Sequence, residues 1–261
     1  MGRVFLGAAT KVEYNWMVAK KQMAQAVCTI TGGLMAKRTT LRDSVIPALE
    51  HTYELQQEDL GADARLSAKG MTFETESWAV SGVGHLCIMR MKAFFGLMRM
   101  ETAVIAPICV DAPLFNLDWV KAFGAETQMA EVYDTQLQPW PAECLEALES
   151  VRAQYADVPD APAGDPRWYD DVLYPCSFHK KAKGMTERMS HASVDFLAGY
   201  VASLASAPAC DREQKAAKVQ AFAERLFDEG GPAVDQVTKL FGDRTAKRLI
   251  LRHMYGVRVP E

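Results

Sequence analysis

The stretch "LMRMETAVIAPICVDAPLFNLDWVKAFGAETQMAEVYD", residues 97–134, carries the pattern on which the fold prediction depends. Apolar and polar residues alternate along short segments, which is typical of strands that bury one face. The breaks between the segments, "CVDAP" and "GAE", are short. Short breaks connect antiparallel neighbours, whereas a parallel crossover needs a dozen or more residues. We therefore predict a meander in which strands 98–106 and 113–122 pair as a hairpin.

Helices are predicted on both sides of this block of strands. Period-2 alternation extends outward from the quoted stretch, and segments with helical apolar spacing come before and after it. This order predicts one α+β domain over residues 1–261, a three-layer α/β/α sandwich in which helices flank a central antiparallel β-sheet. Its parts are N-terminal helices over 12–60, the antiparallel sheet over 65–137 and C-terminal helices over 140–256.

Local signals predict where individual helices begin and end. The pair Gly32-Gly33 stops a first helix. A second helix starts after Thr39 or Thr40, contains Pro47 and is closed by Gly61. The tract "DVPDAPAGDP" is typical of a surface loop. Three further helices are expected at about 185–206, 210–229 and 233–254.

Composition limits the classes of partner. The chain has 261 residues, of which 49% are hydrophobic, and a formal net charge of −4. This balance argues against a nucleic-acid or anionic-membrane partner, although a local basic patch remains compatible with it. No apolar run approaches the ~20 residues that a membrane span needs, and no secretory signal is recognisable. We expect a cytoplasmic protein.

Metal and nucleotide motifs are missing from the sequence. The six cysteines form no C-x-x-C pair and the five histidines form no H-x-x-x-H pattern, so no metal site is predicted. The thiols are expected to be reduced. Neither a G-x-G-x-x-G fingerprint nor a P-loop is present, so a permanently bound nucleotide cofactor is not indicated.

Two carboxylates interrupt the predicted hairpin. Asp118 lies between Leu117 and Trp119, and Glu101 is the only acid of the preceding strand. If both face one apolar cavity, their pKa values diverge, so that one stays ionised while the other is protonated near neutral pH. A proton donor to a reduced substrate needs this arrangement. The alternative is that one or both are ordinary strand residues facing solvent.

Three blocks of sequence resemble a known family. "KAFFGLMRMETAVIAPICVDAPLFNLDWVKAFGAETQMAEVYD", "WYDDVLYPCSFHKK" and "KLFGDRTAKRLILRHMYG" are similar, in order and spacing, to segments of the ferredoxin-dependent bilin reductases and, more distantly, red chlorophyll catabolite reductase. The resemblance covers roughly residues 70–255. The family's P-[LI]-F-x-x-D segment ends in a catalytic proton-donating Asp, which implies that role for Asp118. Thr127 matches a hydroxyl residue that contacts a propionate of the bilin.

The sequence departs from the family at two catalytic positions. Glu101 falls where the group around phycocyanobilin:ferredoxin oxidoreductase has a His, and Met89 falls where it has a Glu. The resemblance therefore implies Asp118 and Glu101 as catalytic residues. Thr127 is the substrate-binding residue that the resemblance implies, and we predict that Met89 and Asn116 also bind the substrate.

The implied activity is ferredoxin-dependent reduction of a linear tetrapyrrole such as biliverdin by a radical mechanism. No organic cofactor would be bound permanently, because ferredoxin or flavodoxin supplies single electrons. Two alternatives stay open, a non-catalytic tetrapyrrole-binding protein on the same fold and a reductase of a different conjugated ligand. The tract 179–183 is either a solvated loop or a docking point for an acidic partner. Candidate contacts for an acidic electron donor are Lys92, Lys121, Lys180, Lys181 and Lys183.

Overall fold

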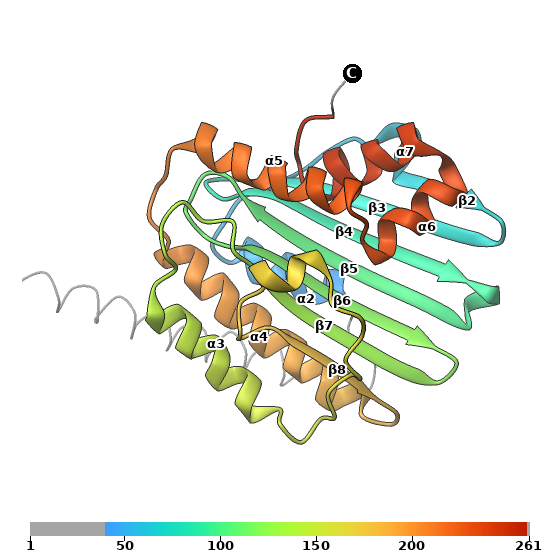
Figure 1. The fold of residues 1–261 in the computed structure, drawn as a ribbon, viewed down its shortest axis with the longest axis horizontal. Helices are drawn as coiled ribbons and strands as arrows, with labels where there is room; N and C mark the ends of the chain where they lie inside the picture. The colour runs from blue at the N-terminus through green and yellow to red at the C-terminus, as the bar shows by residue number, and fades with distance from the viewer. Residues whose placement is uncertain (1–39, 260–261) are drawn as a thin grey trace, which may run out of the picture. The chain divides into compact units, whose positions relative to one another are not determined.

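A single antiparallel sheet forms the centre of the protein (Figure 1). The computed structural model describes residues 40–259, and of Pro232 and Ala233 only the backbone. The strands follow the order β1-β3-β4-β5-β6-β7-β8, and β2 pairs with β3. Their bounds are β1 Leu55–Gln57, β2 Arg65–Ala68, β3 Met71–Val80, β4 Gly84–Ala93, β5 Met98–Pro107, β6 Leu114–Ala122, β7 Ala125–Tyr133 and β8 Phe178–Ala182.

Short connections join the central strands, as the sequence pattern predicted. The hairpin predicted over 98–106 and 113–122 is confirmed, because β5 and β6 pair antiparallel from Met98 opposite Ala122. The two-residue turn between β6 and β7 brings Ala122 opposite Ala125. Consecutive side chains therefore alternate between the two faces of a continuous meander from β3 to β7.

Helices cover both faces of the sheet. Thr40 caps the first described helix, since its hydroxyl accepts a hydrogen bond from the backbone N–H of Asp43 at 3.2 Å. The helical segments are α2 Leu41–Glu50, η1 Gly61–Ala64, η2 Phe94–Gly96, α3 Ala142–Gln154, η3 Trp168–Val172, α4 Thr186–Ser206, α5 Arg212–Asp228, α6 Pro232–Phe241, α7 Asp243–Lys247 and the π-helix η4 Arg248–Met254. No helix among residues 40–259 is long and apolar enough to cross a bilayer.

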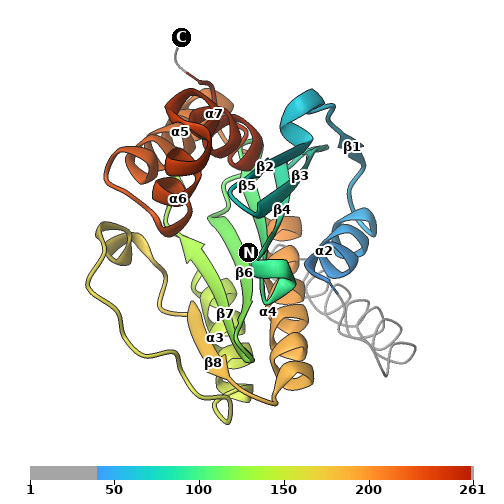
Figure 2. The ribbon, with the colours of Figure 1, turned by 90° about the vertical axis from the view of Figure 1, so that its right-hand side faces the viewer.

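Each face of the sheet has its own core. One core joins α2, α3 and α4 to strand residues such as Phe115 and Leu117, and we call this side the α4 face. The other core joins α5, α6 and η4 to strand residues such as Met89 and Leu114, and we call this side the η4 face. Figure 2 shows the sheet between the two helical layers. The predicted three-layer α+β sandwich is confirmed.

Several predicted boundaries are wrong. Helix α2 ends at Glu50, and residues 55–57 form strand β1 because Leu55 pairs with Val80 at the sheet edge. The sheet also extends beyond 65–137, since β8 adds to β7. The helix predicted over 233–254 is broken at Gly242, whose φ is 80°. The first predicted helix lies outside the described residues, so the single domain over 1–261 stays a prediction.

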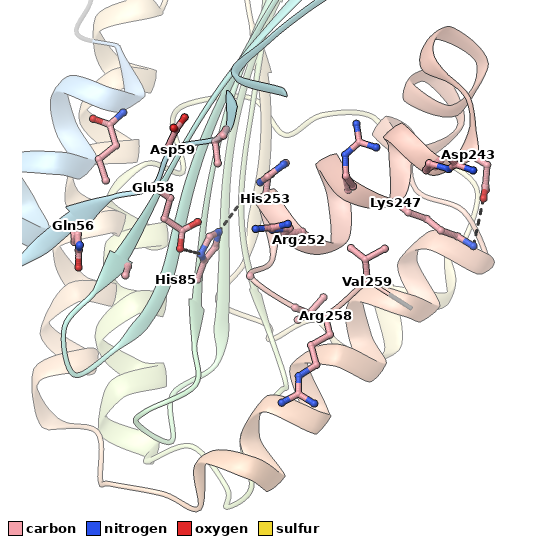
Figure 3. Close-up of a pocket in the computed structure, with 17 residues that line it drawn as sticks. Gln56, Glu58, Asp59, His85, Asp243, Lys247, Arg252, His253, Arg258 and Val259 are labelled. Atoms are coloured by element: carbon pink, nitrogen blue, oxygen red, sulfur yellow. Dashed lines mark hydrogen bonds and ion pairs between the residues drawn. The ribbon is translucent and has the colours of Figure 1, made fainter. Parts of the chain in front are cut away.

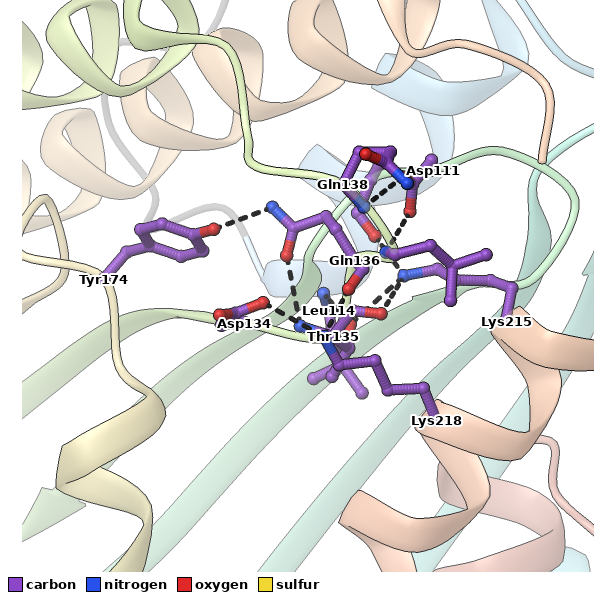
Figure 4. Close-up of polar contacts among 11 residues, drawn as sticks. Asp111, Leu114, Asp134, Thr135, Gln136, Gln138, Tyr174, Lys215 and Lys218 are labelled. Carbon is purple, nitrogen blue, oxygen red and sulfur yellow. Dashed lines mark hydrogen bonds and ion pairs between the residues drawn. The ribbon is translucent and has the colours of Figure 1, made fainter. Parts of the chain in front are cut away.

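A buried lysine fastens helix α5 to the end of the sheet (Figure 4). The Nζ of Lys215 donates hydrogen bonds to the carbonyl oxygens of Ala112 at 2.7 Å and Thr135 at 2.5 Å. Burial lowers the pKa of Lys215 to about 8. Nearby, the Asp111 carboxylate accepts from the backbone N–H groups of Leu137 and Gln138. These contacts join the β5–β6 and β7–α3 connections to the helix that covers the η4 face.

A substitution at Gly84 tests the close backbone contact at the start of β4. A Cβ at this position would lie 2.4 Å from the Ala106 carbonyl oxygen and 2.8 Å from the Ile108 nitrogen. We expect Gly84→Ala to lower the free energy of unfolding by about 2–4 kcal/mol, because backbone must shift. Gly82→Ala is the matched control, because Gly82 also has positive φ but has no atom within 4 Å of the added Cβ. A loss of about 1 kcal/mol is expected there. Equal losses in urea unfolding would contradict the close approach.

Candidate functional site

Strand register brings the candidate site together on the η4 face. Asp118 lies opposite Thr102 on β5 and opposite Met129 on β7. One position along the same face, Asn116 lies opposite Glu131. Directly opposed residues in antiparallel strands point their side chains to the same side. Four polar side chains from three adjacent strands therefore converge beside a largely apolar core.

Asp118 is held by two hydrogen-bond donors. The Thr102 hydroxyl donates to its Oδ1, and the Asn116 side-chain amide donates to its Oδ2 at 2.7 Å. The residue as a whole is partly buried, although its carboxyl group is desolvated. Asp118 is thus fixed in orientation beside the partly exposed side chains of the same sheet face.

Glu131 is the second carboxylate of the site. The amide of Asn116 also donates to its Oε2 at 3.0 Å and so bridges the two acids. The Tyr133 hydroxyl donates to the same oxygen at 2.6 Å, and His179 Nε2 lies 2.8 Å from Oε1. Because an ionised carboxylate only accepts, Nε2 carries the hydrogen in this contact. The His179 side chain is 28% exposed and connects the buried Glu131 to the surface.

The two carboxyl groups have divergent pKa values. Burial raises the pKa of Asp118 to about 6, and the negative charge of Glu131 adds to this rise. Burial acts in the same direction on Glu131, but hydrogen bonds from His179, Tyr133 and Asn116 outweigh it and lower the pKa of that carboxyl. Near neutral pH, Glu131 is therefore an anion and Asp118 is poised to bind and release a proton.

Glu101 does not belong to this site, which corrects the sequence prediction. It lies opposite Trp119, so its side chain points to the α4 face. There its Oε2 accepts a hydrogen bond from the backbone N–H of Leu41 at 2.8 Å, at the first turn of α2. Thr102, the next residue of β5, lies opposite Asp118 and shares its face. Because adjacent residues of a strand face opposite sides, Glu101 cannot share a cavity with Asp118. The carboxylate that shares the face of Asp118 is Glu131.

The predicted substrate-binding residues all lie on the η4 face. Asn116 bridges the acids, Thr127 is partly exposed opposite Val120, and Met89 lies opposite Thr102. Met89 is only 1% exposed and belongs to the core below the C-terminal helices. Of the three, Asn116 and Thr127 border the accessible part of the face.

The accessible part is an apolar strip toward the β4–β5 and β6–β7 turns. Its side chains share the face of Asp118 and are only partly buried, unlike the fully covered positions nearer η4. Figure 1 shows this end of the strands extending past α6 and α7. We call it the methionine strip, and its members are Met98, Met100, Val120, Thr127 and Met129.

A large open cavity lies elsewhere, at the β1 edge of the sheet (Figure 3). It has a volume of about 1350 Å³ and is lined by charged residues, among them Arg252, Arg258 and Glu58. His85 at its floor contacts the His253 carbonyl oxygen at 2.8 Å, and burial lowers the pKa of this imidazole. Neither Asp118 nor Glu131 lines the cavity. We place the candidate chemistry at the carboxylate pair, because divergent pKa values and converging donors occur there.

No cluster of three or more His, Cys, Asp or Glu side chains in the described part of the chain could hold a metal ion. The basic tract 179–183 is mainly strand β8 and not a solvated loop. Lys180 is buried, donating to the Val158 carbonyl oxygen at 3.0 Å and pairing with Asp160. Lys181 and Lys183 are exposed.

Comparison with known proteins finds similarity to solved structures but not to any family model or curated sequence. The structure is similar to phytochromobilin synthase from tomato, solved in complex with biliverdin, with a TM-score of 0.64, 13% sequence identity and 81% of each chain covered. The similarity to this enzyme is therefore a distant structural match. At this identity the likeness shows a shared fold.

The pairing of Asp118 with Glu131 predicts a specific titration. In Glu131→Gln the negative charge that raises the pKa of Asp118 is removed, so we expect this pKa to fall from about 6 toward its ordinary value. Carbon-13 NMR of the Asp118 carboxyl measures it directly.

Glu101→Gln is the matched control for this titration. It removes the same charge from the opposite face of the sheet, so the pKa of Asp118 should not change. If the pKa of Asp118 shifted in Glu101→Gln but not in Glu131→Gln, the assignment of Glu131 as the partner of Asp118 would be contradicted.

Proposed function

We propose that the protein is a ferredoxin-dependent reductase of a linear tetrapyrrole, with Asp118 as the proton donor. The observation that carries the proposal is the Asp118–Glu131 pair, with one raised and one lowered pKa, beside an accessible apolar strip. The fold shared with a biliverdin-bound phytochromobilin synthase supports the class of ligand. The resemblance of the three sequence blocks supports the same family.

The methionine strip suits a flat conjugated ligand. Methionine side chains are flexible and polarizable, so they adapt to an extended π-system. Thr127 lies opposite the exposed Lys181 on β8, and together they offer a hydroxyl donor and a positive charge to a carboxylate such as a propionate. A ligand lying between these residues and Asp118 would cover strands β5 to β7.

Proton and electron transfer alternate in the proposed reaction. A reduced ferredoxin or flavodoxin adds one electron to the bound bilin, and Asp118 then transfers its proton to the resulting radical anion. A second electron and a second proton complete the reduction of one double bond. Asp118 regains a proton from solvent between the steps, which its pKa of about 6 allows near neutral pH. These reaction steps do not require a metal or flavin bound to the protein.

Glu131 has a separate role from Asp118. The hydrogen bonds that Glu131 accepts from Tyr133, Asn116 and His179 stabilise the anion, and its charge adds to the rise in the pKa of Asp118 that burial causes. His179 extends from Glu131 to the surface, so it completes a polar connection between the buried site and solvent. We propose Lys181 and Lys183 as contacts for the acidic electron donor, and exclude Lys180 because it is buried.

One observation favours a non-catalytic tetrapyrrole-binding protein as a second candidate. In the row of side chains that contains Asp118, strands β3 to β5 contribute Thr75, Met89 and Thr102, none of which titrates near neutral pH. A protein that binds biliverdin but shows no donor-dependent reduction would have this second function.

The proposed activity predicts a clear separation between binding and turnover. Biliverdin should bind to the full chain with a change in its visible spectrum and be consumed when reduced ferredoxin is added anaerobically. Asp118→Asn should bind biliverdin equally but turn over about 10²–10⁴-fold more slowly, because a general acid is lost. A persistent radical in the EPR spectrum should accompany the slow step.

Glu101→Gln is the control, since this residue lies on the α4 face, and it should turn over like the parent. The bilin proposal fails if the parent neither binds nor consumes biliverdin. The role of Asp118 fails if the Asn variant reacts at the parent rate.

The pH dependence of the reaction is a separate prediction. The protonated fraction of Asp118 falls above its pKa of about 6, so the rate of proton donation should decline as the pH rises through that value. In Glu131→Gln the lower pKa of Asp118 should move the decline to lower pH. Single-turnover rates between pH 5 and 8 test this, and an unchanged profile in the variant would contradict the coupling.

A further inference from the structure

Large apolar side chains are exposed at one end of the sheet. Phe94, Phe95 and Leu97 belong to the β4–β5 connection, Phe123 belongs to the β6–β7 turn, and each is at least 57% exposed. The rings of Phe94 and Phe123 lie 6.3 Å apart, so the two turns form one surface. We call these four residues the tip surface. Figure 1 shows both turns extending to the right beyond the helices.

The backbone at the tip surface does not favour phenylalanine. Phe94, Phe95 and Phe123 have φ values of 50°, 54° and 50°, in the left-handed region. Asn and Gly are the residues that two-residue hairpin turns normally place there, because bulky side chains are strained. These rings are not buried in the fold, so the fold gains little from them. Strain combined with exposure points to a contact outside the chain.

A row of positive charges crosses the strands beside the tip surface. Lys92 lies opposite Arg99, and Arg99 lies opposite Lys121, on three adjacent strands. Like charges that face each other across strands are destabilising. Lys121 is paired with Glu126 at 3.0 Å, whereas Lys92 and Arg99 form no ion pair with another residue of 40–259. An external anion would relieve this repulsion.

We propose that the tip surface docks onto the surface of an anionic lipid membrane. The exposed rings would enter the boundary between head groups and acyl chains, while Lys92 and Arg99 meet the anionic head groups. Projecting hairpin ends with aromatic tips and flanking cations match a fluid, negatively charged interface. A folded protein partner would need a complementary concave surface.

This docking does not depend on the bilin chemistry. It does place the membrane next to the methionine strip, which runs from the same strand ends toward Asp118. An apolar ligand could then pass between the membrane and the strip without crossing bulk water. Failure of the proposed reductase activity would leave the membrane proposal intact, and the reverse also holds.

Vesicle flotation with the full chain tests the proposal. We expect the protein to float with phosphatidylcholine vesicles that contain phosphatidylserine, to bind vesicles of phosphatidylcholine alone much more weakly, and to dissociate as salt is raised. The double variant Phe95→Asn with Phe123→Asn should bind about tenfold more weakly, because aromatic insertion is lost. Its thermal unfolding should be unchanged or shifted upward, since Asn tolerates positive φ.

A charge reversal tests the cation row separately. Lys92→Glu should weaken binding to the phosphatidylserine vesicles about fivefold or more. Arg212→Glu is the matched control, because Arg212 is also exposed but lies at the start of α5, away from the tip surface. It should bind like the parent.

Two results would overturn the proposal. One is flotation that is equal for the parent and the Phe95→Asn, Phe123→Asn variant. The other is no binding of the parent to anionic vesicles. A concentration-dependent dimer that this variant abolishes would then assign the tip surface to a second copy of the chain.

Discussion

The alternation of side chains along β6 is the constraint on which both the core and the candidate site depend. Phe115, Leu117 and Trp119 pack on the α4 face, so Asn116 and Asp118 must point to the η4 face. A slip of one residue would reverse every side chain of the strand and bury the two polar groups in the wrong core. The apolar residues that stabilise the sheet therefore also determine the face on which the polar side chains of the site lie.

The meander and the start of α2 could be predicted because local signals determine them. The two-residue turn at Phe123-Gly124 also fixes the β6–β7 register, so the sequence held enough information to place Glu131 opposite Asn116. Glu131 lies on β7, outside the β5–β6 hairpin in which the two acids were predicted to pair. His179 was beyond local prediction, since β8 joins the sheet more than 40 residues after β7.

The assignment of Glu101 failed for a physical reason. Residues 108–113 connect β5 to β6, and a connection of this length permits several registers. A shift of one residue in the register between β5 and β6 decides whether Glu101 or Thr102 lies opposite Asp118. The apolar pattern of β5 could not decide the register, because residues 103–106 are all apolar and buried, whichever face each one points to. Only the observed pairing of Thr102 with Asp118 gives the answer.

The net charge of the chain does not describe its local charge. A net charge of −4 is a sum over the whole chain, whereas binding to an anionic surface depends on charges within about a Debye length of it. Lys92 and Arg99 are separated in sequence but adjacent in the sheet, so their combined field appears only after β4 and β5 pair. The same pairing brings exposed phenylalanines next to them. A chain that is acidic on average can therefore present a basic and aromatic edge, and the antiparallel register creates it.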